Sequence, residues 1–128
     1  MKFGMNLLLW ADDIHDDMLP VLEKIKEMGF DGVEVPVFDL NLDKWRTWAN
    51  RLDDLGLERT AVTVCNEEAN PISQDPEIRF RSIDLLKQTL DCCQALGAYS
   101  LTSGYTSKEE FPGSGRELFD QCTQPPFV

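Results

Sequence analysis

The chain has 128 residues, of which 42% are hydrophobic and 27% charged, a composition typical of one globular domain rather than a disordered chain. Its net charge of −11 and the absence of a basic stripe argue against nucleic acid or an anionic membrane as a partner. Because no apolar run approaches the roughly 20 residues of a membrane span and no cleavage site follows the N-terminus, we expect a cytoplasmic protein.

The N-terminal region predicts a strand followed by a helix. The apolar run at 3–10 is typical of a buried strand. The helix is expected to have Asp16 or Asp17 as its N-cap and Pro20 in its first turn, and Gly29 can end it in the left-handed conformation. Its apolar positions recur at helical spacing: Met18, Val21, Leu22, Ile25 and Met28.

The same unit follows again. A strand at 31–37 precedes a helix that is closed by Gly56, and a further strand is expected at 58–65. The apolar face of this second helix consists of Leu42, Trp45, Trp48, Ala49, Leu52 and Leu55.

The third helix has clear signals at both ends. Asp75 is its expected cap, Pro76 its first residue and Gly97 its stop, and a weaker strand follows at 98–105. Its apolar stripe is predicted to consist of Ile83, Leu86, Leu90 and Cys93.

Strands that alternate with helices predict parallel pairing with right-handed crossovers. Two α/β architectures fit this order, a doubly wound open sheet and part of a (β/α)8 barrel. A full barrel takes roughly 250 residues, so the chain would hold about half of one.

The segment 106–128 has a different character. It predicts a Gly/Pro loop, the start of a helix at 116–122 and an irregular tail, because Pro125 and Pro126 forbid helix continuation. We therefore expect a folded domain at 1–105 and an incomplete fourth helix.

Five stretches in order carry a family resemblance: MKFGMNLLLW, GFDGVEVPVFD, LDDLGLERTAVTV, NPISQDPEIR and LDCCQALGA. Together they resemble the N-terminal half of the sugar phosphate isomerase/epimerase proteins, which belong to the xylose isomerase-like TIM-barrel superfamily. Within it they are most similar to ketose 3-epimerases such as the tagatose and psicose epimerases. The resemblance covers residues 1 to about 105 and implies half of a (β/α)8 barrel, with about four parallel strands and three helices.

The resemblance also implies a sugar substrate and a divalent metal (Mn²⁺, Mg²⁺ or Co²⁺) for the full-length family. Two glutamates, an aspartate and a histidine from the ends of strands five to eight hold this metal, and the glutamates move a proton beside the carbonyl. Those strands are not in this sequence, so no residue inherits a catalytic or metal role. The resemblance thus implies an isomerase of the epimerase type, whereas the 128 residues alone are expected to be inactive and to bind no metal.

The segment WADDIHDD at 10–17 surrounds the only histidine, His15, with four aspartates. Histidine and carboxylates can bind Zn²⁺ or Mn²⁺. Aspartates are also favoured at the start of a helix by its unpaired N–H groups and its dipole. We interpret the segment as a loop and a helix start, since metal sites usually draw ligands from several elements.

Five residues are candidates for substrate binding: Asn6, Trp10, Glu34, Thr63 and Tyr105. Asn6 is polar within an apolar strand, and Trp10 shares its strand parity, so both could face a sugar at the barrel mouth. Glu34 lies within a strand, where a buried carboxylate needs a partner. The face of Thr63 is left open by the pattern, and Tyr105 lies near the same mouth.

The four cysteines are Cys65, Cys92, Cys93 and Cys122, and none forms a CxxC pair. We expect reduced thiols, as is usual in a cytoplasmic protein, rather than disulfides or a zinc site.

Three interpretations of function follow. The first is an N-terminal fragment of a metal-dependent sugar or sugar phosphate epimerase. The second is a half-barrel interaction module, whose exposed sheet edges could pair with a second copy to form a homodimer. The third, a self-contained flavodoxin-like regulator, has only the order of the elements in its favour.

Overall fold

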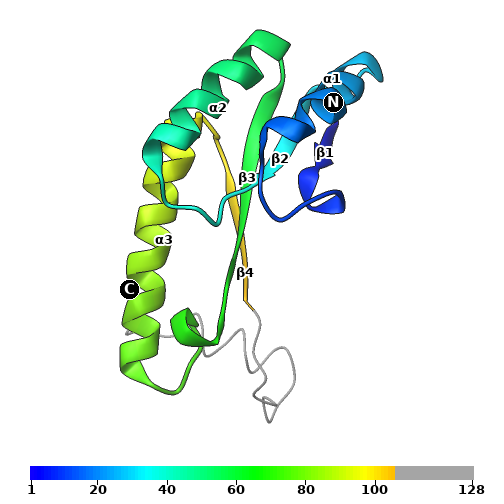
Figure 1. Cartoon of the computed structure of the whole chain (residues 1–128). Coiled ribbons are helices and arrows are strands. Elements are labelled where there is room, and N and C mark those ends of the chain that lie inside the picture. The colour runs from blue at the N-terminus through cyan, green and yellow to red at the C-terminus, as the bar shows by residue number, and fades with distance from the viewer. Residues whose placement is uncertain (106–128) are drawn as a thin grey trace.

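The computed structural model describes residues 1–105 of the chain, and within them four parallel strands form one sheet in the order β1-β2-β3-β4 (Figure 1). The strands are β1 (Gly4–Asn6), β2 (Gly32–Pro36), β3 (Glu58–Cys65) and β4 (Leu101–Tyr105). The connections contain α1 (Leu19–Glu27), α2 (Leu42–Leu55) and α3 (Pro76–Leu96), with short 3-10 helices η1 (Leu7–Leu9), η2 (Asp16–Met18) and η3 (Glu67–Ala69).

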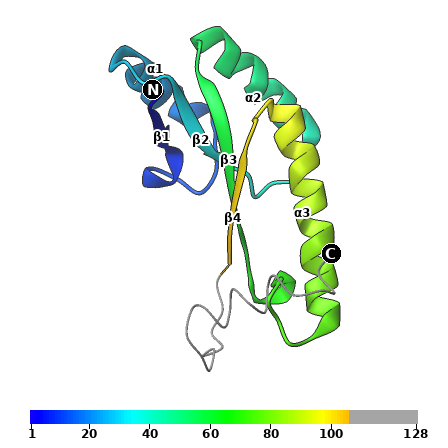
Figure 2. The same ribbon diagram turned by 180° about the vertical axis from the view of Figure 1, so that it is seen from behind.

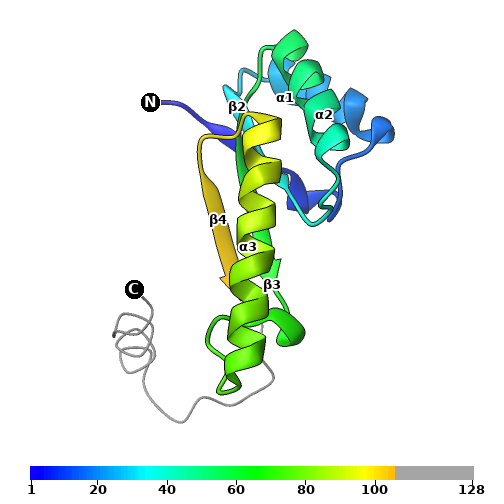
Figure 3. The same ribbon diagram turned by 90° about the vertical axis from the view of Figure 1, so that its left-hand side faces the viewer.

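The strand order and the burial pattern identify half of a barrel. The order never reverses, so the described sheet has no switch point of the kind that a doubly wound fold requires. Val33, Val35 and Ala61 are buried in the core with the helices, whereas the alternate residues Glu34 and Thr60 line a cavity on the other face. Views from behind and from the side show α2 and α3 packed along one face of the sheet (Figures 2 and 3). The flavodoxin-like alternative is therefore wrong.

The helix ends follow the predicted glycine pattern. Gly29, Gly56 and Gly97 all have positive φ, and Gly56 and Gly97 are the left-handed C-caps of α2 and α3. Asp75 caps α3 through a hydrogen bond from the Glu77 N–H, as its position before a proline predicts.

Strand β1 is shorter than predicted. It ends at Asn6, and Leu7–Leu9 form a 3-10 helix in place of the expected continuation to Trp10. The cause is local, because the Asn6 side chain accepts a hydrogen bond from the Leu8 N–H and turns the chain.

The start of α1 also differs from the prediction. Neither Asp16 nor Asp17 caps it; both lie in η2, and α1 begins at Leu19 with Pro20 in its first turn. Leu22 and Ile25 are buried as expected, whereas Met28 is exposed.

The buried face of α3 is rotated from the predicted stripe. Of the predicted positions, Cys93 is buried, while Ile83 and Leu90 are 43% and 53% exposed. Ser82 and Thr89 are buried instead, because their hydroxyls donate to helix carbonyls within α3.

Cys65, Cys92 and Cys93 are buried free thiols, whereas Cys122 and the rest of 106–128 lie outside the described residues. No helix in residues 1–105 has the length and apolar character needed to cross a membrane.

Candidate functional site

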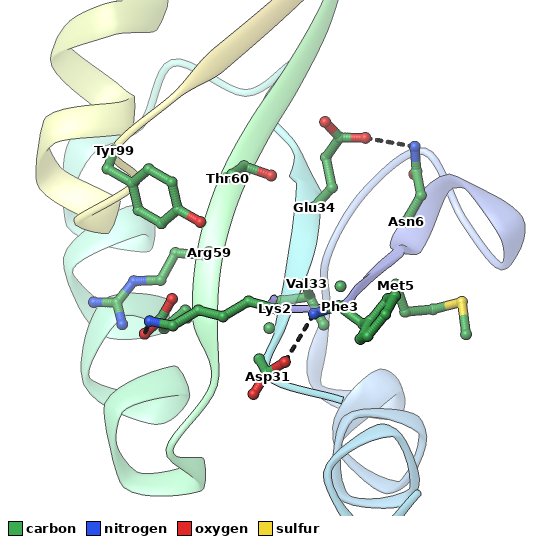
Figure 4. Close-up of a pocket in the computed structure, with 13 residues that line it drawn as sticks. Lys2, Phe3, Met5, Asn6, Asp31, Val33, Glu34, Arg59, Thr60 and Tyr99 are labelled. Atoms are coloured by element: carbon green, nitrogen blue, oxygen red, sulfur yellow. Dashed lines mark hydrogen bonds and ion pairs between the residues drawn. The ribbon is translucent and has the colours of Figure 1, made fainter. Parts of the chain in front are cut away.

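The face of the sheet turned away from the helices forms a concave surface with a cavity of about 280 Å³ (Figure 4). Parallel pairing aligns Asn6 with Glu34 and Glu34 with Thr60, which puts three polar residues from three strands in one row. All three line the cavity, and most of its other lining residues lie at the amino ends of the strands, among them Lys2, Asp31 and Glu58. The register of the sheet therefore makes this row the polar floor of the half-barrel.

Asn6 and Glu34 are joined by a hydrogen bond. Nδ2 of Asn6 donates to Oε2 of Glu34 over 2.7 Å, and Oδ1 of Asn6 accepts from the Leu8 N–H over 2.8 Å. Figure 4 shows the two side chains turned toward each other from β1 and β2. Because both polar ends of the Asn6 amide are engaged, the amide is fixed in orientation and holds the Glu34 carboxylate in place in the polar floor of the cavity.

At the amino ends of the strands, polar contacts join the beginnings of the strands to one another and to the end of α3. Lys2 pairs with Glu58, and this hydrogen bond raises the pKa of Lys2. The Phe3 N–H donates to Oδ2 of Asp31 over 2.7 Å. Arg59 donates from Nε to the Leu96 carbonyl over 2.8 Å. In barrel proteins this end usually serves stability, and these contacts fit that role.

Two exposed aromatic residues follow the carboxyl ends of β1 and β2, the edge of the sheet at which the mouth of a barrel lies. Trp10 is 48% exposed at the end of η1, and Phe38, just after β2, is 42% exposed. Since β1 ends at Asn6, strand parity does not place Trp10, and its position depends on the loop that holds it. Sequence reasoning passed over Phe38, an aromatic residue that directly follows the strand expected at 31–37.

The segment WADDIHDD forms ion pairs with α2. Nζ of Lys44 lies 2.6 Å from Oδ1 of Asp13, and Arg51 pairs with Asp16. His15 lies with Nδ1 4.0 Å from Asp17 and has a half-exposed side chain. The contact with Arg51 lowers the pKa of Asp16. The segment is a loop that leads into η2, and two of its four aspartates, Asp13 and Asp16, contact cations of α2.

The other two residues predicted to bind substrate are Thr63 and Tyr105. Thr63 is 3% exposed and alternates with Val62 and Val64, on the face of β3 that the helices cover. Tyr105 is the last residue of β4 and pairs in register with Cys65, and its side chain lies outside the described part. Thr60, which sequence reasoning did not select, reaches the cavity because of its register with Glu34.

Comparison with known proteins connects this half-barrel to a family. Residues 22–124 match the family described as "Xylose isomerase-like TIM barrel". The chain belongs to the xylose isomerase-like TIM-barrel family.

Relatives within or near this family include named epimerases. The ketose 3-epimerase of Arthrobacter globiformis is 28% identical over 99 residues, which are 77% of this chain and 34% of that protein. The D-allulose 3-epimerase of Methylomonas sp. superposes with a TM-score of 0.71 at 21% identity, over 88% of this chain and 40% of that one. A D-psicose 3-epimerase of Clostridium cellulolyticum, with a TM-score of 0.67 and 21% identity, covers 80% and 37%. The chain thus spans about a third to two fifths of these xylose isomerase-like proteins.

The described half-barrel does not fit the metal that the family resemblance implies. Among residues 1–105, no group of three or more His, Cys, Asp and Glu side chains is arranged to hold an ion. A divalent cation needs several oxygen or nitrogen ligands together, so no reaction step can be derived through a metal bound here.

Proposed function

We propose that this chain is the N-terminal, sugar-contacting half of a ketose 3-epimerase-like isomerase. The observation that carries the proposal is the Asn6–Glu34 pair, a fixed carboxylate on the concave face of a half-barrel from a family whose named relatives include ketose 3-epimerases. The inactivity of the 128 residues alone is part of the proposal.

The residues on this face offer the contacts that a sugar needs. A carboxylate held by a neighbouring amide accepts a hydrogen bond from a sugar hydroxyl, and Oε1 of Glu34 is the atom that would accept it. The Thr60 hydroxyl lies in the same row. Trp10 and Phe38 would offer apolar ring faces to the carbon skeleton at the mouth. Thr63 and Tyr105 do not enter the proposal, since Thr63 is covered by helices.

The reaction itself would need groups from the remaining part of the barrel. Proton transfer beside a carbonyl requires a positioned base and an electrophile that polarises the oxygen. When a divalent metal is bound in the complete barrel, it would supply that polarisation. Residues of this chain would then bind and orient the ketose and exclude water from one side of it.

The choice of ketoses rests on similar structures, which carry the names D-psicose, D-fructose and D-tagatose in their descriptions. We therefore expect free ketohexoses to bind to this face. A phosphate group would need a free cation at the mouth, and within residues 1–105 Lys44 at this edge of the sheet is already paired with Asp13 and Asp39.

A binding experiment tests the proposal directly. Saturation-transfer NMR with D-psicose should detect weak binding to the chain, and Glu34→Gln should weaken it roughly tenfold, the effect of one charged hydrogen bond. Glu23→Gln, on the exposed side of α1, is the matched control and should bind as the unchanged chain does. Equal binding by the Glu34 variant, or no binding of any ketohexose by the unchanged chain, would refute the proposal.

A second candidate function is a half-barrel module that dimerises. It is favoured by the two edges of the described sheet, since β1 pairs only with β2 and β4 only with β3. Because all four strands are parallel, a second copy could add its β1 to β4 and close a barrel. Light scattering of the purified chain tests this, and a monomer at all concentrations would exclude it.

A further inference from the structure

We infer that Lys44 is a positioning residue, which ties the β1–α1 loop to the β2–α2 loop and thereby fixes Trp10 and Phe38 at the mouth of the half-barrel. The inference rests on the proposed function for what the two aromatic residues contact. The link between the two loops follows from the contacts of Lys44 alone.

Lys44 contacts a carboxylate from each loop. Nζ lies 2.6 Å from Oδ1 of Asp13, three residues after Trp10, and 3.2 Å from Oδ2 of Asp39, the residue after Phe38. Its side chain is 19% exposed, much less than is usual for lysine. A single ammonium group therefore bridges two loops that leave neighbouring parallel strands at the same edge of the sheet.

The position of the ammonium group is itself constrained. Lys44 lies in the first turn of α2, whose N–H groups are capped by Oδ1 of Asn41 at 3.0 and 3.3 Å. The next residue, Trp45, is fully buried and donates from Nε1 to the Asp39 carbonyl over 2.6 Å. The β2–α2 loop is thus attached to α2 at two points, and Lys44 links this attached loop to its neighbour.

Within the β1–α1 loop, Lys44 attaches the part that directly follows Trp10. Farther along, Ile14 is 1% exposed in the core and Asp16 pairs with Arg51. The N–H groups of Trp10 and Ala11 donate to the carbonyl of buried Leu7, over 2.9 and 3.2 Å, and beyond Ala11 the ion pair of Asp13 attaches the loop to α2. Releasing it would free the segment that directly follows Trp10, while Leu7 and Ile14 stay in the core.

The electrostatics of the cluster agree with this geometry. Burial acts to lower the pKa of Lys44, yet the contacts with Asp13 and Asp39 outweigh it and raise that pKa. The Asn41 N–H and Lys44 together lower the pKa of Asp39. Lys44 and Asp39 are therefore charged at neutral pH, as the bridge requires.

The test compares Lys44→Met, which keeps the length and removes the charge, with Lys44→Arg, which keeps the charge. Lys24→Met is the matched control, since Lys24 is 69% exposed on α1 and pairs only with Glu27 nearby. Hydrogen exchange of the full chain should become roughly fivefold faster in segments 8–13 and 37–41 of Lys44→Met. Lys44→Arg should restore protection, and Lys24→Met should leave it unchanged.

A second readout separates positioning from simple stability. D-psicose binding should weaken severalfold in Lys44→Met and recover in Lys44→Arg, with exchange in the β3 core unaltered. Unchanged exchange in either loop overturns the inference, and so does unchanged affinity in Lys44→Met. If the unchanged chain binds no ketose, the proposed function and this role of Lys44 toward sugar both fail, while the exchange data still decide whether Lys44 joins the loops.

Discussion

Replacing Asn6 with alanine removes two hydrogen bonds at once, the one to Glu34 and the one from the Leu8 N–H. A hydrogen bond to a charged group contributes about 1.5–3 kcal/mol, and a side-chain cap of this kind about 0.5–2 kcal/mol. Because Glu34 is only half-buried, we take the lower part of the first range. Asn6→Ala should therefore lower the free energy of unfolding by about 2–3 kcal/mol.

A double-mutant cycle isolates the Asn6–Glu34 bond. Glu34→Ala removes the same bond and leaves the Leu8 contact intact, so the double variant should be more stable than the sum of the single effects predicts. We expect a coupling free energy of about 1–2 kcal/mol from urea unfolding followed by circular dichroism. The assay requires a common dependence on urea among the variants, since a changed slope would indicate a changed unfolded state.

Asn41→Ala serves as the matched control for this cycle. It also removes an asparagine whose side chain caps a helix, but at α2 and without contact to Glu34. Its effect of about 1 kcal/mol should add to that of Glu34→Ala within about 0.5 kcal/mol. A coupling below about 0.5 kcal/mol between Asn6 and Glu34 would show that the carboxylate is not held by the amide, and would remove the basis for a fixed sugar contact.

Three further predictions concern the frame of the half-barrel. Gly32→Ala would put a Cβ 2.4 Å from a carbonyl oxygen of β3 and should destabilise the chain by about 1–3 kcal/mol in urea unfolding, while Gly4→Ala, at 3.3 Å, should cost less. A backbone N–H and Lys44 lower the pKa of Asp39, so the ionised Asp39 side chain stabilises the fold above its ordinary pKa near 3.8. This stabilisation is lost as the pH falls further, and Asp39→Asn should therefore reduce the loss of stability in thermal melts between pH 5 and 2. Burial raises the pKa of Cys93 to about 11, so alkylation at pH 8, followed by mass spectrometry, should be far slower in the native chain than in urea.

The sequence predicted those elements whose boundaries depend on local backbone chemistry. Strand β3 covers Glu58–Cys65 as expected, and α3 begins at Pro76 behind its Asp75 cap. The glycine stops were also predicted, because a left-handed residue at a helix end is a property of that residue. The half-barrel followed from the alternation of these elements together with the family resemblance.

The errors arose where a side chain competes with the backbone pattern. Hydropathy alone predicts a strand through Leu7–Leu9, but the Asn6 amide captures the Leu8 N–H and begins a turn. In α3, Ser82 and Thr89 lie outside the predicted apolar stripe, yet each hydroxyl donates to a carbonyl of its own helix, at 2.7 and 2.9 Å. A hydroxyl whose hydrogen bond is made within its own helix can be buried. The buried face of α3 therefore includes Ser82 and Thr89 and is rotated away from Ile83 and Leu90.

The candidate site was predictable residue by residue, but its geometry was not. Asn6 and Glu34 were each selected as polar residues in apolar strands, while the bond between them depends on the register of β1 and β2, which no local pattern specifies. Thr60 was missed for the same reason. Thr63 was selected but lies on the covered face of β3. An alternating strand presents two faces, and only the packed helices decide which one is covered.

The cluster WADDIHDD shows that a group of charged residues indicates a function only once the partners of each side chain are known. Four aspartates around a histidine look like a ligand set, but Asp13 is paired with Lys44, 31 residues away in sequence, and Asp16 with Arg51, 35 residues away. Carboxylates already neutralised by lysine and arginine are poor ligands for a cation, since binding would first have to break those pairs. The acidic segment is therefore joined to α2 by its ion pairs, and in residues 1–105 it is not part of a group of side chains that could hold a metal ion.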